Sequence, residues 1–389
     1  MNERGAGGDA GTRGDAPGVI GWDVGGANTK VARVPAVPRA PREPRPPIAA
    51  AVRAYEVQRD PAALPGVLRA LAQAVGAEDG DMHALTMTAE LSQYFRTKRD
   101  GVGFVLDGMA AAFPDASVHV YSVHGEFLSP GGARDAPLAV AAANWAATAR
   151  AVAHLAPDAL LVDIGTTTTD IIPIVGGRVV ATGWTDPDRL ASGELLYLGA
   201  VRTPVEAITH TVPFGEGDAG ASAEGWAVAG DVHLWRGTLA ADAYTTPTPD
   251  GRPATRVFAG ERLARVVCAD REMIDGAALD RIADAVAAAQ IARTADAVAR
   301  VHARHPSIDT AVVTGAGDFI AAAAAERAGL TVRWLADEFG ADAARAAPAS
   351  AVALLLASHR GTDRGADRGA DRSADRSADR STARGANRG

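Results

Sequence analysis

Cysteine and lysine are both scarce in this sequence, and no long apolar run interrupts it. The single cysteine, Cys268, excludes a disulfide framework and a zinc site built from several cysteines, and we expect it in the core of a protein from a reducing compartment. No stretch approaches the roughly 18 apolar residues of a membrane span, and the N-terminus has no apolar leader. A cytoplasmic protein without membrane association is therefore expected.

Lysine is rarer than the basic composition suggests, because only Lys30 and Lys98 are lysines among 39 basic residues. So broad a preference for arginine indicates a GC-rich coding background and says nothing about individual arginines. A lysine that persists against it is more informative, since arginine does not replace a compact ammonium charge on a flexible stem, for example against a phosphate. Lys30 and Lys98 are therefore candidates for a functional site.

The overall composition is that of a globular protein of one large or two medium domains, with 389 residues, 47% of them hydrophobic, and a net charge of −8. Residues 1–18 and 359–389 have almost nothing to bury, and the second segment repeats Ala-Asp-Arg-Gly/Ser, so both are expected to be disordered tails. The acidic body between them argues against a nucleic-acid partner.

Strands and helices are expected to alternate between the tails, which predicts an α/β protein with helices on both faces of each sheet. The expected strands are 19–23, 30–34, 48–57, 117–123, 160–163, 171–175, 178–182, 310–314 and 330–335. The expected helices are 62–75, 103–113, 137–155, 189–197, 204–208, 277–303, 319–328 and 350–358, and a proline-rich loop covers 35–47. We assign two domains, 19–155 and 156–358, with a final helix that can pack back on the first.

The first strand–turn–strand unit recurs at a constant offset of 140 residues. The offset places Asp23 over Asp163, Gly25 over Gly165, Thr29 over Thr169 and Lys30 over Asp170. Two short matches can arise by chance, but their common strand–turn–strand context favours duplication.

Each repeated turn begins with an Asp at a strand end and continues with glycine and small polar residues. Glycines let backbone N–H groups approach an anion, and the hydroxyls of Thr166, Thr167 and Thr168 can add donors to phosphate oxygens. Asp23 and Asp163, facing each other across a cleft, would hold Mg²⁺ through waters. The alternative is a pair of tight hairpins in which Asp and Thr only form turns.

A third loop also has the pattern of a phosphate- or nucleotide-binding loop, although it connects a strand to a helix and not two strands. The strand 310–314 runs through Gly315-Ala316-Gly317-Asp318 directly into a helix, and backbone amides at a helix start favour an anion. Gly-x-Gly alone is weak, so its value lies in its order after the two repeated turns.

Together these loops resemble the phosphate 1, phosphate 2 and adenosine signatures of the actin, sugar-kinase and heat-shock ATPase superfamily. The resemblance implies duplicated actin-like ATPase (ribonuclease H-like) domains flanking a central cleft. The stretch from Asp163 to Asp170, Asp-Ile-Gly-Thr-Thr-Thr-Thr-Asp, resembles the hydantoinase/oxoprolinase branch.

The chain also contains segments that this fold does not require, namely Thr86-Met-Thr-Ala-Glu90-Leu with Phe95, Lys98 and Gly101-Val102, Asn144-Trp145, Leu196-Tyr-Leu-Gly199, Arg202-Thr-Pro-Val205, Thr248-Pro-Asp-Gly-Arg252, Arg262-Leu-Ala-Arg265 and Asp270. Together these segments resemble the methanofuran-core synthase family of tetrahydromethanopterin-linked one-carbon metabolism. The resemblance covers residues 18–358, and the proline-rich loop and the long tail depart from the family pattern without touching these motifs.

The resemblance implies a transferase that joins an aminomethyl-furan-methanol pyrophosphate to the phenol oxygen of a γ-glutamyl-tyramine or tyrosine acceptor, releasing pyrophosphate. Small molecules are then the partners, Mg²⁺ is the expected cofactor, and ATP is not consumed. A homo-oligomer is compatible with the sequence. The alternatives are an ATP-dependent kinase or oxoprolinase-type amide hydrolase, and a non-catalytic nucleotide-binding module.

On this interpretation Asp23 and Asp163 bind the metal, and the candidate catalytic residues are Lys30, Lys98, Glu90 and Asp170. Glu90 either binds the aminomethyl ammonium or removes the phenol proton, unless it only caps or pairs. The expected pyrophosphate and substrate contacts are Gly25, Gly26, Asn28, Thr29, Gly165, Thr166, Thr167, Thr168, Arg202, Gly315 and Gly317. Arg202 and Glu206, one helical turn apart, form an ion pair or line the acceptor site.

Overall fold

The structure is a computed structural model that describes residues 17–35 and 47–359. Most of the predicted tails and of the proline-rich loop lie outside the described residues. Among the described residues no helix is both long and apolar enough to cross a membrane.

The first sheet begins with β1 (Val19–Val24), a strand buried along its whole length. Its six strands run in the order β3-β2-β1-β4-β5-β6, with β2 antiparallel and β4 parallel to β1. The other strands are β2 (Asn28–Val34), β3 (Ala49–Ala54), β4 (Met82–Met87), β5 (Val118–Tyr121) and β6 (Phe127–Leu128). Around the sheet lie η1 (Pro61–Ala63), α1 (Leu64–Ala74), η2 (Ala89–Leu91), α2 (Lys98–Ala112), α3 (Pro130–Asp135) and α4 (Pro137–Val140).

The second sheet repeats this arrangement around β7 (Ala159–Ile164), again a wholly buried strand. Its order is β10-β8-β7-β13-β14, and β9 also pairs with β8. The strands are β8 (Thr169–Val175), β9 (Arg178–Val179), β10 (Leu195–Leu196), β13 (Thr310–Thr314) and β14 (Thr331–Trp334). The helices around it are α5 (Asn144–Ala153), α6 (Asp186–Ser192), α10 (Gly276–His302), α11 (Asp318–Arg327), α12 (Leu335–Phe339) and α13 (Ala341–Arg345).

The two sheets carry the duplicated unit in identical register. Asp23 pairs with Lys30 between β1 and β2, and Asp163 pairs with Asp170 between β7 and β8, 140 residues later. In each sheet a parallel strand follows on the other side of the first, β4 beside β1 and β13 beside β7. An antiparallel pair extended by parallel strands is the ribonuclease H-like arrangement, so the expected α/β fold with duplicated actin-like domains is confirmed.

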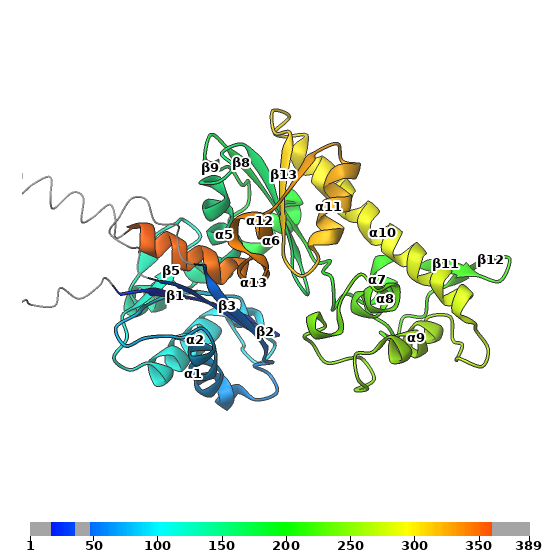
Figure 1. Ribbon diagram of the computed structural model, residues 1–389, viewed down its shortest axis with the longest axis horizontal. Coiled ribbons are helices and arrows are strands. Elements are labelled where there is room, and N and C mark those ends of the chain that lie inside the picture. The colour runs from blue at the N-terminus through cyan, green and yellow to red at the C-terminus, as the bar shows by residue number, and fades with distance from the viewer. Residues whose placement is uncertain (1–16, 36–46, 360–389) are drawn as a thin grey trace, which may run out of the picture.

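A last helix, residues 347–359, connects the end of the second half to the first sheet. Its Ala351 and Val352 share one core with Val19 and Val34 of the first sheet and with residues of α5. In Figure 1 this orange-red helix lies over β1 and β5. The last described residues of the chain therefore pack against the first sheet and contribute to its hydrophobic core.

A separate lobe, residues 198–275, is inserted between β10 and α10, and Figure 1 shows it beside the two sheets. It contains α7 (Val205–Ile208), β11 (Thr211–Phe214), β12 (Gly217–Gly220), α8 (Ala229–Arg236), η3 (Ala241–Ala243) and α9 (Arg256–Arg265). Its core includes Leu198, Trp235 and Leu263 and also takes in Leu279 and Ile282 of α10.

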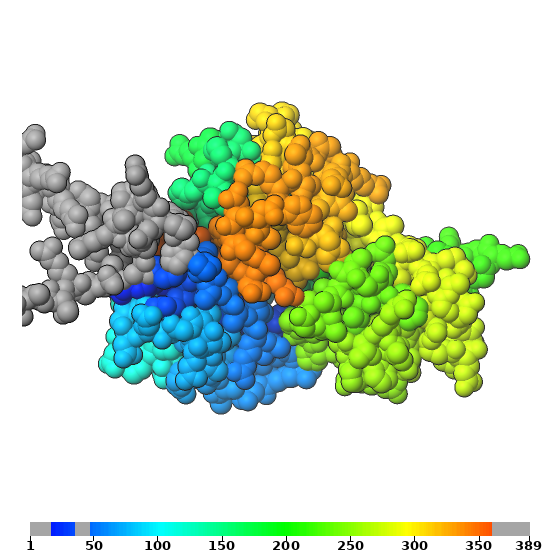
Figure 2. Space-filling model, in the orientation of Figure 1, coloured from blue at the N-terminus to red at the C-terminus, as the bar shows by residue number. Residues whose placement is uncertain are grey.

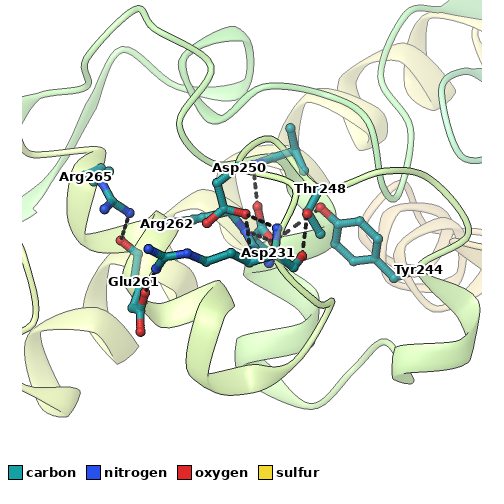
Figure 3. Close-up of polar contacts among 9 residues, drawn as sticks. Asp231, Tyr244, Thr248, Asp250, Glu261, Arg262 and Arg265 are labelled. Atoms are coloured by element: carbon teal, nitrogen blue, oxygen red, sulfur yellow. Dashed lines mark hydrogen bonds and ion pairs between the residues drawn. The ribbon is translucent and has the colours of Figure 1, made fainter.

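The lobe is fixed internally by a buried ion cluster around Arg262 (Figure 3). The Arg262 guanidinium donates to Asp231 Oδ1 at 2.7 and 2.8 Å and to Asp250 Oδ1 at 3.0 Å. The Tyr244 hydroxyl donates to Asp231 Oδ1 at 3.3 Å. Because these groups come from α8, α9 and the loop between them, the cluster ties that loop, which includes Asp242 and Thr245, to two helices.

Several sequence predictions are wrong in detail. The helix expected at 137–155 is interrupted at 141–143, because Ala141 bridges to Met87 and Ala142 adopts a left-handed φ of 50°. The helix expected at 189–197 ends at Ser192, and β10 follows. The helices α8 and α9 have no counterpart among the expected elements. Cys268 is exposed, with a φ of 56°, on the surface of the lobe instead of in the core.

Candidate active site

A cleft of about 680 Å³ lies between the two halves and is also bordered by the lobe. Residues of β3 in the first half, Asp342 to Pro348 near the last helix and Asp242 to Thr245 in the lobe all line it. In Figure 2 the cleft opens where the blue first half, the orange segment and the lime lobe meet. A ligand in it would contact three parts of the chain at once.

Two matching rows of side chains form the polar centre of this cleft. In the first row, strand pairing places Val52, Lys30, Asp23 and Thr86 side by side. In the second row it places Leu195, Asp170, Asp163 and Thr314 side by side. Paired residues of neighbouring strands share a face of a sheet. Each half thus contributes an apolar residue, a charged residue, an Asp and a Thr in the same order.

The first row is held together by an ion pair. Lys30 Nζ donates to Asp23 Oδ2 at 3.0 Å, and about a quarter of the Lys30 side chain is exposed. Burial alone would lower the pKa of Lys30, but the carboxylates of Asp23, Asp163 and Asp170 outweigh it and raise that pKa above its ordinary value. Lys30 therefore remains a cation at the centre of the cleft.

The second row carries two carboxylates where the first has a lysine and a carboxylate. Asp170 pairs with Arg189 of α6, which is buried and stacks on the Trp145 ring at 4.3 Å. Burial, together with the charge of Asp170, raises the pKa of Asp163 to about 7, although Lys30 opposes the shift. A cation bound next to Asp163 would therefore lower its pKa and keep the carboxyl group ionised.

The residues predicted to bind Mg²⁺, Asp23 and Asp163, both line the cleft. In the described ranges no group of three or more His, Cys, Asp or Glu side chains could hold a metal ion. Mg²⁺ commonly keeps several waters and takes one or two carboxylates with phosphate oxygens. The buried Oδ1 of Asp23, which has no hydrogen-bond partner among the described residues, suits that donor set.

The two repeated turns close in the same way. Gly25 N donates to Asn28 O at 3.0 Å, and Gly165 N donates to Thr168 O at 2.9 Å. The residues of both turns that line the cleft are Gly25, Gly26, Ala27, Asn28, Gly165, Thr166, Thr167 and Thr168. Asn28 Oδ1 is buried without a partner in the described structure, which is the state expected of a group that meets a ligand.

Two predicted contact residues do not line the cleft. Thr29 is fully buried in β2, one position along from Asn28, so its side chain lies on the opposite face of the sheet. Gly317 donates its amide to Ile164 O at 2.8 Å and lies close to Ile164 and Ala200, so it is part of the strand–helix packing. Both predictions are corrected for these physical reasons.

Gly315 of the third loop does line the cleft and lies against the second row. Its φ is +96°, and a Cβ at this position would be 2.5 Å from Asp163 Oδ1. Only glycine combines this left-handed conformation with so close an approach to the carboxyl group. The third loop therefore shapes the position of Asp163.

Glu90 is a buried carboxyl group without a partner. Both of its oxygens are buried and make no hydrogen bond within the described part of the chain, although Glu90 lines the cleft. Burial raises its pKa to about 8, which the charge of Lys98 opposes and that of Asp186 supports. A Cβ at Gly101 would lie 2.4 Å from Glu90 Cα, so α2 needs glycine there to pack against it.

Lys98 connects the two halves of the protein. Its Nζ donates to Asp186 Oδ2 at 2.8 Å, and this contact joins the first residue of α2 to the first residue of α6.

Arg202 lines the cleft as well. Its side chain is exposed and has no partner among the described residues. The carboxylate of Glu206 instead accepts from Gly225 N at 2.7 Å, so the alternative of an Arg202–Glu206 ion pair is wrong.

Sequence reasoning missed several side chains that line the cleft, notably Asp186, Arg189, Tyr197 and Arg345. Arginine is so common in the chain that its abundance hides the individual arginines of the site. One available signal for Arg189 was its place shortly after the repeated turn, on a helix that returns toward Asp170.

Comparison with known proteins identifies the family of the chain. The hydantoinase/oxoprolinase family model matches residues 81–359. A (4-{4-[2-(gamma-L-glutamylamino)ethyl]phenoxymethyl}furan-2-yl)methanamine synthase from Methanocaldococcus jannaschii is 33% identical, with the match covering 87% of this chain and 97% of the relative. A synthase of the same name from Methanococcus vannielii is 32% identical over 51% of this chain and 90% of its own length.

A solved structure supports the fold alone. Acetone carboxylase in its nucleotide-free form is similar with a TM-score of 0.50 and 11% identity, covering 86% of this chain and 70% of that one. The family model and the long match to curated relatives show that the chain belongs to the hydantoinase/oxoprolinase family and, within it, to the furan-2-yl-methanamine synthases.

Proposed function

We propose that this protein joins an aminomethyl-furan-methanol pyrophosphate to the phenol oxygen of a γ-glutamyl-tyramine-type acceptor. The match to the M. jannaschii synthase along 97% of that enzyme carries the proposal. The bond between the furan methylene carbon and the pyrophosphate oxygen breaks, and a bond between that carbon and the phenol oxygen forms. Pyrophosphate leaves with the bonding electrons, and the phenol loses its proton.

The two repeated turns are assigned to the pyrophosphate. They bring the Gly26 backbone, the Asn28 side chain and the hydroxyls of residues 166–168 to one cleft, whereas the Gly25 and Gly165 N–H groups close the turns themselves. Stabilising the departing charge is the main requirement, because a furfuryl-type carbon can carry positive charge by resonance. Lys30, at the middle of the first row, is placed to neutralise the leaving group.

The charge of the cleft supports a requirement for Mg²⁺. Seven carboxyl groups and five cations line the cavity, and three of the cations, Lys30, Lys98 and Arg189, are already paired with carboxylates in it. A pyrophosphate brought into this acidic cleft therefore needs further positive charge. Asp23 and Asp163 would hold the ion, which supplies electrostatic stabilisation of the leaving group.

Glu90 is assigned as the base for the phenol. The acceptor phenol has an ordinary pKa of about 10, and a carboxylate of ordinary pKa would be a weak base for it. Burial raises the pKa of Glu90 to about 8, which brings the two groups closer in proton affinity. No described side chain donates a hydrogen bond to its oxygens, so a substrate phenol in the cleft can donate to them.

Arg202 is assigned to the acceptor. Arg202 has no partner in the described residues, so its guanidinium is free to meet the glutamyl carboxylate. Lys98 holds the two halves together through Asp186 beside Glu90, and Asp170 orients the second row through Arg189.

The decisive experiment supplies purified protein with Mg²⁺, the furan pyrophosphate and γ-glutamyl-tyramine. Mass spectrometry should detect the aryl ether, and pyrophosphate should appear in equal amount without any ATP. A parallel reaction with the tyrosine-based acceptor identifies the preferred phenol. Absence of ether with either phenol, or a product that requires ATP, would contradict the proposal.

A further inference from the structure

Four large apolar side chains are exposed on the walls of the cleft. They are Val52 (39% exposed), Leu91 (51%), Leu190 (48%) and Tyr197 (60%). Single exposed apolar residues are ordinary on protein surfaces, but several that line one cavity indicate a ligand surface. We call these four residues the apolar band.

The apolar band directly borders the polar centre. Val52 is paired in register with Lys30, so it forms the outer end of the first row. Leu91 follows Glu90 in η2, and Leu190 follows Arg189 in α6. On both halves of the protein, residues of the apolar band are therefore direct neighbours of charged residues of the cleft.

Tyr197 has a fixed place beside the second repeated turn. On its N-terminal side, Leu195 and Leu196 pair with Asp170 and Thr169 of β8. On its C-terminal side, Leu198 O accepts from the Thr169 hydroxyl at 2.5 Å, and Arg202 N donates to Thr166 O at 2.8 Å. The backbone around the Tyr197 ring is thus held on both sides, although the ring itself is exposed.

Resting on the proposed function, we propose that the apolar band holds the aromatic ring of the phenol acceptor, with Tyr197 as the residue that positions that ring. The furan is bonded through its methylene carbon to the pyrophosphate, which keeps it close to the charged rows. The acceptor ring has no such tether and needs an apolar surface of its own. The band provides one next to Glu90, the assigned base, and Arg202, the assigned partner of the glutamyl group.

The test measures acceptor binding and turnover in Tyr197→Ala and Tyr197→Phe. Loss of the ring should raise the KM for γ-glutamyl-tyramine about tenfold, on the scale of an aromatic contact. The KM for the furan pyrophosphate and the kcat at saturating acceptor should stay within about twofold, because Tyr197 touches neither reacting bond. Tyr197→Phe keeps the ring and should restore the acceptor KM.

Two further variants separate specific from general effects. Leu190→Ala should raise the acceptor KM in the same direction. Leu138→Ala, which removes a still more exposed leucine (66%) of α4 outside the cleft, should leave it unchanged. Circular dichroism checks that each variant is folded. An unchanged acceptor KM in both Tyr197→Ala and Leu190→Ala, or an increase confined to the furan pyrophosphate, would overturn the inference.

Failure of the proposed function has a different signature. If the wild-type protein forms no ether, the reaction is wrong, whatever Tyr197 does. Saturation-transfer NMR of γ-glutamyl-tyramine with wild type and Tyr197→Ala then still tests the band without turnover. A ring signal in wild type that disappears in the variant supports the band, and an equal signal or no signal in wild type contradicts it.

Discussion

The two rows of the cleft share a backbone register but differ in charge and in burial. In the first row Lys30 pairs with Asp23 along the sheet, and a quarter of the lysine side chain is exposed. In the second row Asp170 takes the position of the lysine, and its partner Arg189 comes from a helix and is only 2% exposed. Duplication thus preserved the geometry, whereas substitution turned one row into an accessible cation and the other into a buried carboxylate pair. This difference predicts that the first row serves mainly chemistry and that the second also supports the fold.

Removing the cation of the first row should have the largest effect on catalysis. Lys30→Met should lower kcat by a factor of about 10² to 10³, as expected when one preorganised group that stabilises leaving-group charge is lost. Steady-state assays of ether formation measure it. Arg33→Met is the matched control, because Arg33 lies on the same strand but pairs with Asp81 away from the cleft. Equal loss of kcat in the two variants, or full activity in Lys30→Arg, would contradict the role given to Lys30.

Removing the cation of the second row should have the largest effect on stability. Arg189→Met leaves Asp170 buried without its partner, and we expect a loss of about 3–5 kcal/mol in the free energy of unfolding. Denaturant titration measures this loss. Arg236→Met, which breaks an exposed pair with Asp284, should cost at most about 1 kcal/mol. If both variants lost the same small amount, the second row would have no structural role.

The sequence predicted the rows but not their surroundings. A constant offset of 140 identifies Asp23, Lys30, Asp163 and Asp170, because local strand–turn–strand patterns depend on neighbouring residues. The partners of these residues arrive from distant segments.

Arg189 belongs to α6, which begins and ends earlier in the chain than the helix expected at 189–197, and Glu90 lies in η2 directly after strand β4. Nothing local in Leu91, Leu190 or Tyr197 distinguishes a cleft residue from a core residue, so the apolar band required the tertiary structure.

The pH dependence should report Glu90 from the first half. Burial raises its pKa from about 4.5 to about 8, with Lys98 of α2 and Asp186 of α6 as the facing charges. The base form therefore accumulates as pH rises, and kcat/KM should increase through pH 8 and level off about one pH unit above the pKa. Glu90→Gln should abolish this increase and reduce kcat about 10²-fold or more. A pH profile of Glu90→Gln that matches wild type would show that another group titrates.

The same shift makes an opposite prediction for stability. Between pH 4.5 and 8 the folded protein holds a proton on Glu90 that the unfolded chain has lost, so the free energy of unfolding should fall as pH rises through this range. Glu90→Gln removes that contribution, and its stability should depend less on pH than that of wild type. Thermal unfolding at pH 6 and pH 8 compares the two, and an equal pH dependence would argue that Glu90 is not buried as described.

The smallest effect should come from the contact that joins the two halves. The side chains of Lys98 and Asp186 are 24% and 17% exposed, so water and salt screen this pair more than the buried Arg189–Asp170 pair. Lys98→Gln should therefore cost about 1 kcal/mol or less in unfolding free energy, and this cost should shrink at high salt. If Lys98 also binds a substrate carboxylate, Lys98→Gln should raise the acceptor KM at every salt concentration. Measuring the acceptor KM of this variant at low and high salt therefore distinguishes a link between the halves from a substrate contact.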